Sequence, residues 1–246
     1  LLKLLRYYPL SQLFVVLIIG FLGYIFLSYS RRAEQNRVWV GLAKETAHQL
    51  GTPISSLMAW VELIKTRFDA EEDPLVAEME NDIQRLEIIA DRFSKIGSMP
   101  ILEDHVVYII INNFVQYFRV RASDKINFVI TGDTQVRAML SAPLFDWVIE
   151  NLIKNALDAM EGKGTIRIDA YQTNEGLQID VTDTGKGISN AHLNKVFKPG
   201  FTTKKRGWGL GLSLSKRIIN QYHGGELYVK HSEPGKGTTF RITLKK

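Results

Sequence analysis

The chain of 246 residues contains no cysteine, and its five histidines are scattered along the sequence. The absence of cysteine excludes a disulfide framework, a thiol nucleophile, a cysteine-based zinc site and an iron–sulfur cluster. The histidines do not have the spacing of metal ligands. A G-x-x-x-x-G-K-[ST] sequence is also absent, so phosphate is not held by a Walker A loop.

The composition is otherwise that of a globular protein, with 45% hydrophobic and 23% charged residues. The length accommodates one or two domains of about 150 residues. The net charge of +5 fits an anionic ligand or a membrane surface. Because lysine and arginine are spread along the chain and no base-reading motif occurs, we expect no nucleic-acid partner.

One long apolar run lies near the start of the sequence. Residues 7–30 carry no charged side chain, and roughly 20 helical residues cross a bilayer core. The run is too long for a signal peptide and is not followed by a small-residue cleavage site. We therefore predict a transmembrane helix with a short flank over residues 1–30. Four basic residues follow and place that side in the cytoplasm, namely Arg31, Arg32, Arg37 and Lys44.

Two helices with apolar heptad seams are predicted next. Pro53 is the one turn signal between Arg31 and Phe68, so we expect the membrane helix to continue directly into the first of them. A polar turn leads to the second helix, which begins at Pro74 with Asp73 as its cap. Because each helix of this hairpin has a seam to bury, we predict a homodimer in which two hairpins form a four-helix bundle. The seam residues are Val40, Ala43, Ala47, Leu50, Ile54, Leu57, Val61, Ile64 and Phe68, then Val76, Met79, Ile83, Leu86, Ala90 and Phe93.

A single histidine, His48, follows the seam residue Ala47, so we expect its imidazole to lie beside the core and to be exposed. Glu45 and Thr52 lie on the same helix face as His48. Pro53 removes one backbone N–H and predicts a bend beside this histidine. A proline within a helix costs about 3 kcal/mol, which favours a functional reason for its position.

The C-terminal half has a different pattern. Its helices and antiparallel strands predict a two-layer α+β sandwich. Ser141 is a possible cap of the middle helix, and a hairpin joins two of the strands. The helices are predicted over residues 106–120, 143–160 and 212–223, and the strands over residues 125–131, 165–171, 176–182, 226–231 and 238–244.

Two glycine clusters lie in this half, at 183–187 after a strand and at 207–211 before a helix. Glycine lets the backbone approach phosphate closely, and a helix N-terminus offers free N–H groups. The second cluster does not match G-x-G-x-x-G, and no βαβ unit surrounds it. We therefore expect a nucleotide that is held by neither a Walker A loop nor a dinucleotide-binding G-x-G-x-x-G loop.

Six segments in order make the chain resemble a membrane-bound sensor histidine kinase of two-component systems. The resemblance implies a HisKA-type dimerisation hairpin and a Bergerat (GHKL-type) ATP-binding domain. The segments are 47–54, similar to the H-box; 150–156, the N-box; 183–187, the G1 box; 197–201, the F-box; 207–211, the G2 box; and 237–240, the last glycine motif.

The resemblance implies that ATP and Mg²⁺ bind in the C-terminal half. Asn155 would be the magnesium ligand, and the Asp183 carboxylate would accept a hydrogen bond from the adenine amino group. Asn151 stands where the ATPases of this superfamily have a glutamate, so hydrolysis by water is expected to be slow. The implied nucleotide-binding residues are Asn151, Lys154, Asn155, Asp183, Gly185, Gly187, Ile188, Phe197, Phe201, Thr202, Thr203, Lys204, Gly207, Gly209, Leu210, Gly211, Leu212 and Thr238.

The acceptor of the γ-phosphoryl group would be His48, and the next acceptor an aspartate in the receiver domain of a response regulator. Thr52 has the position at which the family orients water for dephosphorylation of that partner. Gln49 replaces the usual acid and is unable to act as a base. Either Glu45 assists from the preceding turn, or the proton leaves to solvent.

The expected division is a membrane segment at 1–30, a dimerisation and phosphotransfer hairpin at 31–99 and a catalytic ATP-binding domain at 100–246. The resemblance implies a bacterial inner-membrane protein with its catalytic part in the cytoplasm. Two other functions remain open: a membrane-anchored dimeric scaffold with an inactive nucleotide domain, and an ATP-driven clamp. The intact Asn155 and Asp183 disfavour the scaffold, while His48 and the missing glutamate at position 151 disfavour the clamp.

Overall fold

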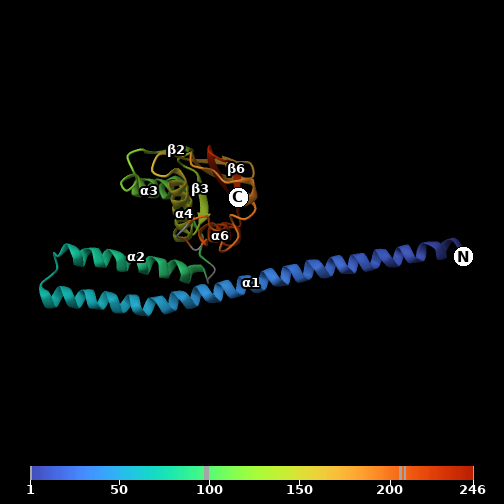
Figure 1. Ribbon diagram of the computed structural model, residues 1–246, viewed down its shortest axis with the longest axis horizontal. Helices are drawn as coiled ribbons and strands as arrows, with labels where there is room; N and C mark the ends of the chain where they lie inside the picture. The colour runs from blue at the N-terminus through green and yellow to red at the C-terminus, as the bar shows by residue number, and fades with distance from the viewer. Residues whose placement is uncertain (1, 97–99, 205–206, 208, 246) are drawn as a thin grey trace. The chain divides into compact units, whose positions relative to one another are not determined.

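The structure is a computed structural model of the chain (Figure 1) that describes residues 2–96, 100–204, 207 and 209–245. Within the helices, the side chains of 2–11, 28, 30–40, 42–44, 92–93 and 96 lie outside the description. The chain divides into two compact units, residues 1–98 and 99–246.

The first unit begins with a single long helix, α1 (Leu2–Phe68). The predicted continuity of the N-terminal helix with the hairpin helix is thus confirmed, and α1 passes through Pro53 without interruption. Within the described residues, no helix combines the length and the apolar character that a membrane crossing requires. The span predicted at residues 7–30 is therefore not confirmed, and the basic side chains after it lie outside the described ones.

Helix α2 (Pro74–Ile96) packs back along α1 to form the predicted hairpin. The Asp73 carboxylate accepts a hydrogen bond from the N–H of Leu75 at 2.8 Å, which confirms the predicted cap. The hairpin buries Ile54, Val61, Val76, Ile83 and Ala90, while Leu50, Leu57 and Ile64 pack partly against them.

Part of the predicted seam is exposed, as expected for a single hairpin, which was predicted to leave some of its seam uncovered. Phe68 is 70% exposed, Met79 45% and Leu86 43%. Within one hairpin each helix has a single neighbour, so only the seam positions that face this neighbour are covered. The side chains of Val40, Ala43 and Phe93 lie outside the described part.

The second unit contains a five-stranded sheet in the order β2-β4-β5-β7-β6. The central hairpin of β4 and β5 confirms the prediction, as do β6 and β7. Strands β2 and β4 are parallel, and the other pairs are antiparallel. The strands are β2 (Ile126–Gly132), β4 (Gly164–Thr173), β5 (Gly176–Asp183), β6 (Glu226–Glu233) and β7 (Gly237–Lys245).

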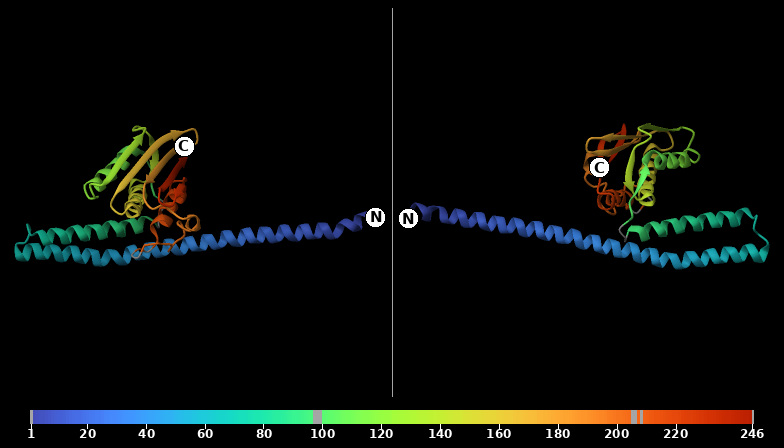
Figure 2. Two further views of the ribbon diagram at one scale, coloured as in Figure 1. Left: turned by 45° about the horizontal axis from the view of Figure 1, so that its top comes forward. Right: turned by 180° about the vertical axis from the view of Figure 1, so that it is seen from behind.

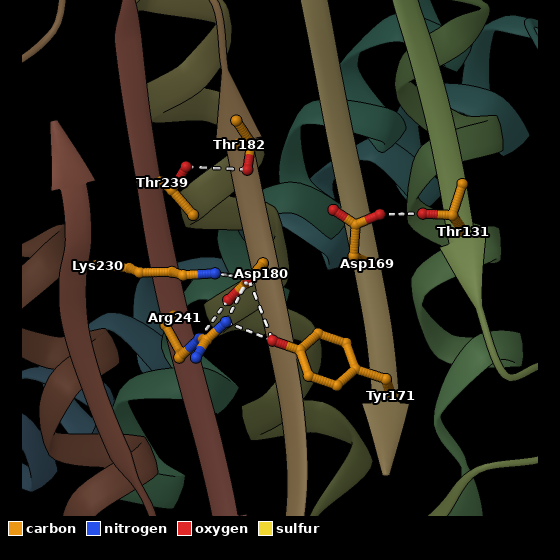
Figure 3. A network of polar contacts seen from close by, with 8 residues as sticks. All are labelled: Thr131, Asp169, Tyr171, Asp180, Thr182, Lys230, Thr239 and Arg241. Carbon is orange, nitrogen blue, oxygen red and sulfur yellow. Dashed lines mark hydrogen bonds and ion pairs between the residues drawn. The ribbon is translucent and has the colours of Figure 1, made fainter. Parts of the chain in front are cut away.

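Helices cover one face of this sheet and complete the predicted two-layer sandwich (Figure 2). Apolar side chains of alternate strand residues, such as Ile168 and Ile179, meet Phe145 and Ile149 of the central helix, and all four are fully buried. The opposite face carries polar side chains (Figure 3). The helices are α3 (Val107–Arg119), α4 (Ala142–Met160), the short α5 (Asn190–Leu193) and α6 (Gly211–Arg217).

Three local expectations for this unit are wrong. Two short strands, β1 (Glu103–Val106) and β3 (Arg137–Leu140), form a separate antiparallel ribbon that the sequence did not predict. The helix expected over 212–223 changes after α6 into a π-helical segment, η1 (Ile218–Tyr222). Ser141 precedes α4 but its hydroxyl makes no capping bond, since Pro143 occupies the first turn and leaves one N–H fewer to cap.

His223, just after η1, joins three elements of the sandwich. Its Nε2 accepts a hydrogen bond from the Ser141 N–H at 3.1 Å, and its Nδ1 lies 3.0 Å from the Ile218 carbonyl oxygen. Nδ1 therefore carries the proton of a neutral ring. Burial lowers the pKa of His223, although the hydrogen bond between its Nδ1 and the Ile218 carbonyl acts in the opposite direction.

Because the pKa of His223 is lower in the folded than in the unfolded state, the unfolded state binds more protons below about pH 6.5. We expect the stability of the sandwich to be full above this pH and to decline as the pH falls through it. Hydrogen–deuterium exchange of the β5 and β7 peptides between pH 7.5 and pH 5 measures this decline. His223→Asn should be less stable throughout and show a flatter dependence, whereas equal slopes would contradict the assignment.

Candidate active site

A cavity of about 640 Å³ lies in the second unit between α4, the end of β5 and the segment from α5 to α6. Its volume is within the range of small-molecule sites, about 300–1,000 Å³. All the nucleotide-binding residues suggested by the sequence line it, apart from Lys154, Gly185 and Phe197. Residues from five of the six segments, spread from position 151 to position 238, are therefore brought together.

Asp183 forms the floor of the cavity at the last residue of β5. Its side chain is 5% exposed, and its Oδ1 accepts a hydrogen bond from the Gly185 N–H at 2.8 Å. Burial raises the pKa of Asp183, while backbone hydrogen bonds from Gly185 and Thr238 partly offset this rise. A buried carboxylate of this kind is poised to accept a hydrogen bond from a ligand.

Asn151 and Asn155 lie one turn apart on α4 and face the cavity. The amide nitrogen of Asn151 donates to the Ser215 hydroxyl at 2.9 Å. This bond leaves Oδ1 of Asn151 directed toward Gly211. A Cβ at position 211 would lie only 2.3 Å from that oxygen. Ser215, which is buried, thus orients Asn151 and was not predicted from the sequence.

A lysine supplies positive charge beside the second asparagine. The Lys204 ammonium donates to Oδ1 of Asn155 at 2.9 Å and to Oδ2 of Asp158 at 2.5 Å. The Asn155 amide nitrogen is buried and has no hydrogen-bond partner among the described residues. It is therefore available to an acceptor such as a phosphate oxygen.

Glycine is required at two points of the cavity wall. Gly187 has a φ of 70°, and a Cβ there would lie 2.2 Å from the Glu233 carbonyl oxygen. Gly209 has a φ of 65°, and a Cβ there would lie 2.5 Å from the carbonyl carbon of Gly200. A side chain at either position would force the wall apart.

Three predicted residues do not line the cavity. Lys154 is exposed and pairs with Glu150 at 2.6 Å, because it lies on the outer side of α4. Gly185 is buried, and a Cβ there would lie 2.7 Å from Ala159. Phe197 packs edge-on against Phe240, with 6.2 Å between ring centroids, and so supports the wall from behind.

The cavity also contains residues that the sequence did not single out. His192 packs edge-on against Phe201, with a ring separation of 5.2 Å. Asp158 could have been found from the helical period, since it lies three residues after Asn155. The others depend on tertiary contacts that no local pattern shows; the additional lining residues are Asp158, Ala159, Lys186, Ser189, His192, Val196, Pro234 and Phe240.

His48 lies in the first unit, on α1, and is exposed as expected. Gln49 donates a hydrogen bond from its amide nitrogen to the Glu45 carboxylate at 2.7 Å, so this pair is formed beside the histidine. Thr52 is exposed, and its carbonyl oxygen accepts a bond from the Ser56 hydroxyl at 3.2 Å. The expected bend at Pro53 stays a prediction.

Together, the cavity residues fit a nucleoside triphosphate with a divalent cation. Asp183 offers an acceptor for an exocyclic amino group, and Lys186 and Lys204 offer positive charge for phosphates. The Asn155 oxygen accepts a hydrogen bond from the Lys204 ammonium, and amide oxygens are among the ligands that Mg²⁺ takes in proteins.

Comparison with known proteins supports this reading of the cavity. Residues 142–246 match the family described as histidine kinase-, DNA gyrase B-, and HSP90-like ATPase. The chain is 32% identical over 209 residues to sensor histidine kinase ZraS of Escherichia coli, covering 82% of this chain and 44% of that protein. It is 28% identical over 254 residues to sporulation kinase D of Bacillus subtilis, covering 96% and 49%. Nitrogen regulation protein NtrY of Azorhizobium caulinodans is 28% identical over 233 residues, with 87% and 29% covered.

The chain spans less than half the length of these curated relatives. Among solved structures, the catalytic domain of histidine kinase ThkA is similar at 26% identity with a TM-score of 0.52, covering 59% of this chain and 95% of that one. Full-length ShkA in complex with AMPPNP shares the fold at a TM-score of 0.63, with 18% identity and 83% and 46% covered.

Proposed function

Since residues 142–246 belong to the histidine kinase-, DNA gyrase B- and HSP90-like ATPase family, in a chain related to sensor histidine kinases, we propose that this protein is a histidine autokinase. ATP binds in the cavity around Asp183, and His48 accepts its γ-phosphoryl group. The observation that carries the proposal is the convergence of Asn151, Asn155, Asp183 and Lys204 on one cavity in a chain whose α1 exposes His48.

The Asp183 carboxylate accepts the adenine amino group and sets the base at the closed end of the cavity. The Asn155 oxygen would hold Mg²⁺, which would supply positive charge to neutralise the phosphates. Lys204, Gly209 and Gly211 line the same cavity and would contact the phosphates. Asn151 is unable to take a proton from water, so this site is suited to transfer rather than to hydrolysis.

In the transfer, a nitrogen of neutral His48 forms a bond to the γ-phosphorus. The bond from that phosphorus to the bridging oxygen breaks, and ADP leaves with the oxygen. The proton on the other ring nitrogen then passes to the Glu45 carboxylate or to solvent. Gln49, held by Glu45, keeps this carboxylate beside the histidine.

We further propose that His48 passes the phosphoryl group to an aspartate of a response-regulator receiver domain. This acceptor follows from the relation to sensor kinases, and the exposure of His48 supports it. The Thr52 hydroxyl, four residues after His48 and on the same helix face, would hold the water that hydrolyses the phosphoryl-aspartate of that partner to phosphate.

Homodimerisation through the hairpin is supported by its exposed apolar side chains. Met58, Leu63, Phe68, Met79 and Leu86 are each more than 40% exposed, although α1 and α2 already share a buried core. A second hairpin packed against α1 and α2 would bury apolar side chains of this kind in a four-helix bundle.

Attachment to the membrane is supported by the segment before the hairpin. Its large apolar side chains from Leu13 to Leu27 are exposed, from 42% at Ile18 to 71% at Tyr24 and Phe26. No charge interrupts the surrounding residues 7–30. We propose that this part of α1 lies in the bacterial inner membrane, with the helical hairpin and the second unit in the cytoplasm.

The proposal is tested by incubation with γ-labelled ATP and Mg²⁺. We expect the protein to acquire an acid-labile, base-stable label that His48→Gln abolishes. His231→Gln, which removes an exposed histidine on β6, is the matched control and should retain the label. Label that survives in His48→Gln would contradict the proposal, and ATP binding without label in the wild type would favour the scaffold function.

A further inference from the structure

Lys204 binds two oxygen atoms of α4 with one ammonium group. Its Nζ lies 2.9 Å from Oδ1 of Asn155 and 2.5 Å from Oδ2 of Asp158. Both side chains line the cavity, together with Lys204 itself. The lysine reaches them across 49 and 46 residues of sequence, so the contact is tertiary.

The two oxygens are suited to a divalent cation. Asn155 and Asp158 are three residues apart on one helix, so their side chains project from one face. Amide and carboxylate oxygens are the ligands that Mg²⁺ prefers, and few protein ligands are needed because phosphate oxygens and water supply the others. The ammonium of lysine is a compact point charge that takes the same kind of partners.

We propose that Asn155 Oδ1 and the Asp158 carboxylate together form the cation subsite of the cavity, and that Lys204 is its internal competitor. In the nucleotide-free chain Lys204 holds both oxygens. When nucleotide enters with Mg²⁺, Lys204 releases them and turns its charge to the phosphates. The inference rests on the proposed function, which assigns Asn155 alone to the metal.

Charge balance gives this exchange a consequence. While Lys204 pairs with Asp158, its positive charge is neutralised and contributes little to phosphate binding. Once the divalent cation neutralises Asp158, the ammonium is free for the phosphates. Metal and nucleotide therefore strengthen each other's binding, and the coupling depends on both side chains.

The test is the binding of ADP to the full chain, measured by calorimetry in EDTA and across a series of Mg²⁺ concentrations. The midpoint is the Mg²⁺ concentration that gives half of the total gain in ADP affinity. In Lys204→Met this midpoint should fall about 3-fold, a modest change because the ion pair is partly exposed. In Asp158→Asn the metal-free affinity for ADP should rise and the gain from Mg²⁺ should shrink by about 5-fold, because Lys204 is freed and one ligand is lost.

Two controls make the result decisive. Lys195→Met removes an exposed lysine that does not line the cavity and should leave the Mg²⁺ midpoint unchanged. Adding Lys204→Met to Asp158→Asn should shift the midpoint less than Lys204→Met does alone, since the competition is already weakened. An unchanged midpoint in Lys204→Met, or additive effects in the double variant, would overturn the inference. If the wild type fails to bind ADP at all, the proposed function is what fails.

Discussion

Asp183→Asn should weaken nucleotide binding by at least about 30-fold while leaving the fold intact or slightly more stable. The carboxylate is 5% exposed and its pKa is raised, mainly by burial, so the folded state carries a desolvated charge at neutral pH. Removing the charge relieves this cost, since a raised carboxyl pKa makes the folded state less stable above the unfolded pKa of about 4. An asparagine oxygen can still accept the Gly185 N–H.

The same change places an NH₂ group where the adenine amino group requires an acceptor. Losing a charge-assisted hydrogen bond and burying two donors against each other costs at least about 2 kcal/mol, or about 30-fold in affinity. Calorimetry with ADP and thermal unfolding of the full chain measure the two effects. Retained affinity would remove Asp183 from the site, and a large loss of thermal stability would show that its role is structural.

Asp180→Ala should instead destabilise the sandwich strongly. Asp180 lies three residues before Asp183 on β5 but points to the opposite, polar face of the sheet (Figure 3). The Arg241 guanidinium donates two hydrogen bonds to the Asp180 carboxylate, of 2.6 and 2.7 Å, and the Lys230 ammonium donates a third of 2.8 Å. Removing the acid leaves the largely covered Arg241 without its main partner, at a cost of about 3 kcal/mol.

The pKa of Asp180 reflects these partners. Burial alone would raise it, but the hydrogen bonds and charges of Arg241 and Lys230 outweigh burial and lower it. Its stabilising contribution is therefore present above the unfolded pKa of about 4 and is lost as the pH falls through the lower folded value. Urea unfolding of the full chain followed by circular dichroism should show the loss. Asp169→Ala, which removes a partly exposed acid on β4 that bonds to Thr131, is the control with a small expected effect.

The contrast between Asp180 and Asp183 shows what sequence could predict. The strand itself follows from the alternation of apolar residues over 176–182, and Asp183 could be selected because a glycine cluster follows it. Sequence does not reveal that Asp180 is equally buried, because its partners Lys230 and Arg241 come from strands about 50 and 60 residues away. A pattern identifies the element, whereas the neighbouring strands determine the chemistry of its side chains.

The same distinction explains the other differences. The hairpin, α4 and β4–β7 were predictable from helical and strand periods. The β1–β3 ribbon was not, because four-residue strands carry too little pattern and exist through their pairing with each other. Ser215 and the bonds from Lys204 to Asn155 and Asp158 also depend on tertiary proximity.

The most direct test of the central claim is to locate the phosphoryl group itself. The protein is incubated with ATP and Mg²⁺, digested at neutral to basic pH and analysed by fragmentation mass spectrometry. The peptide to follow is residues 45–65, which contains His48 along with Thr46, Thr52, Ser55 and Ser56. We predict one phosphoryl group on His48 that disappears after brief acid treatment. An acid-stable phosphoryl group on one of the hydroxyl residues, or none on this peptide while ATP is bound, would contradict the account.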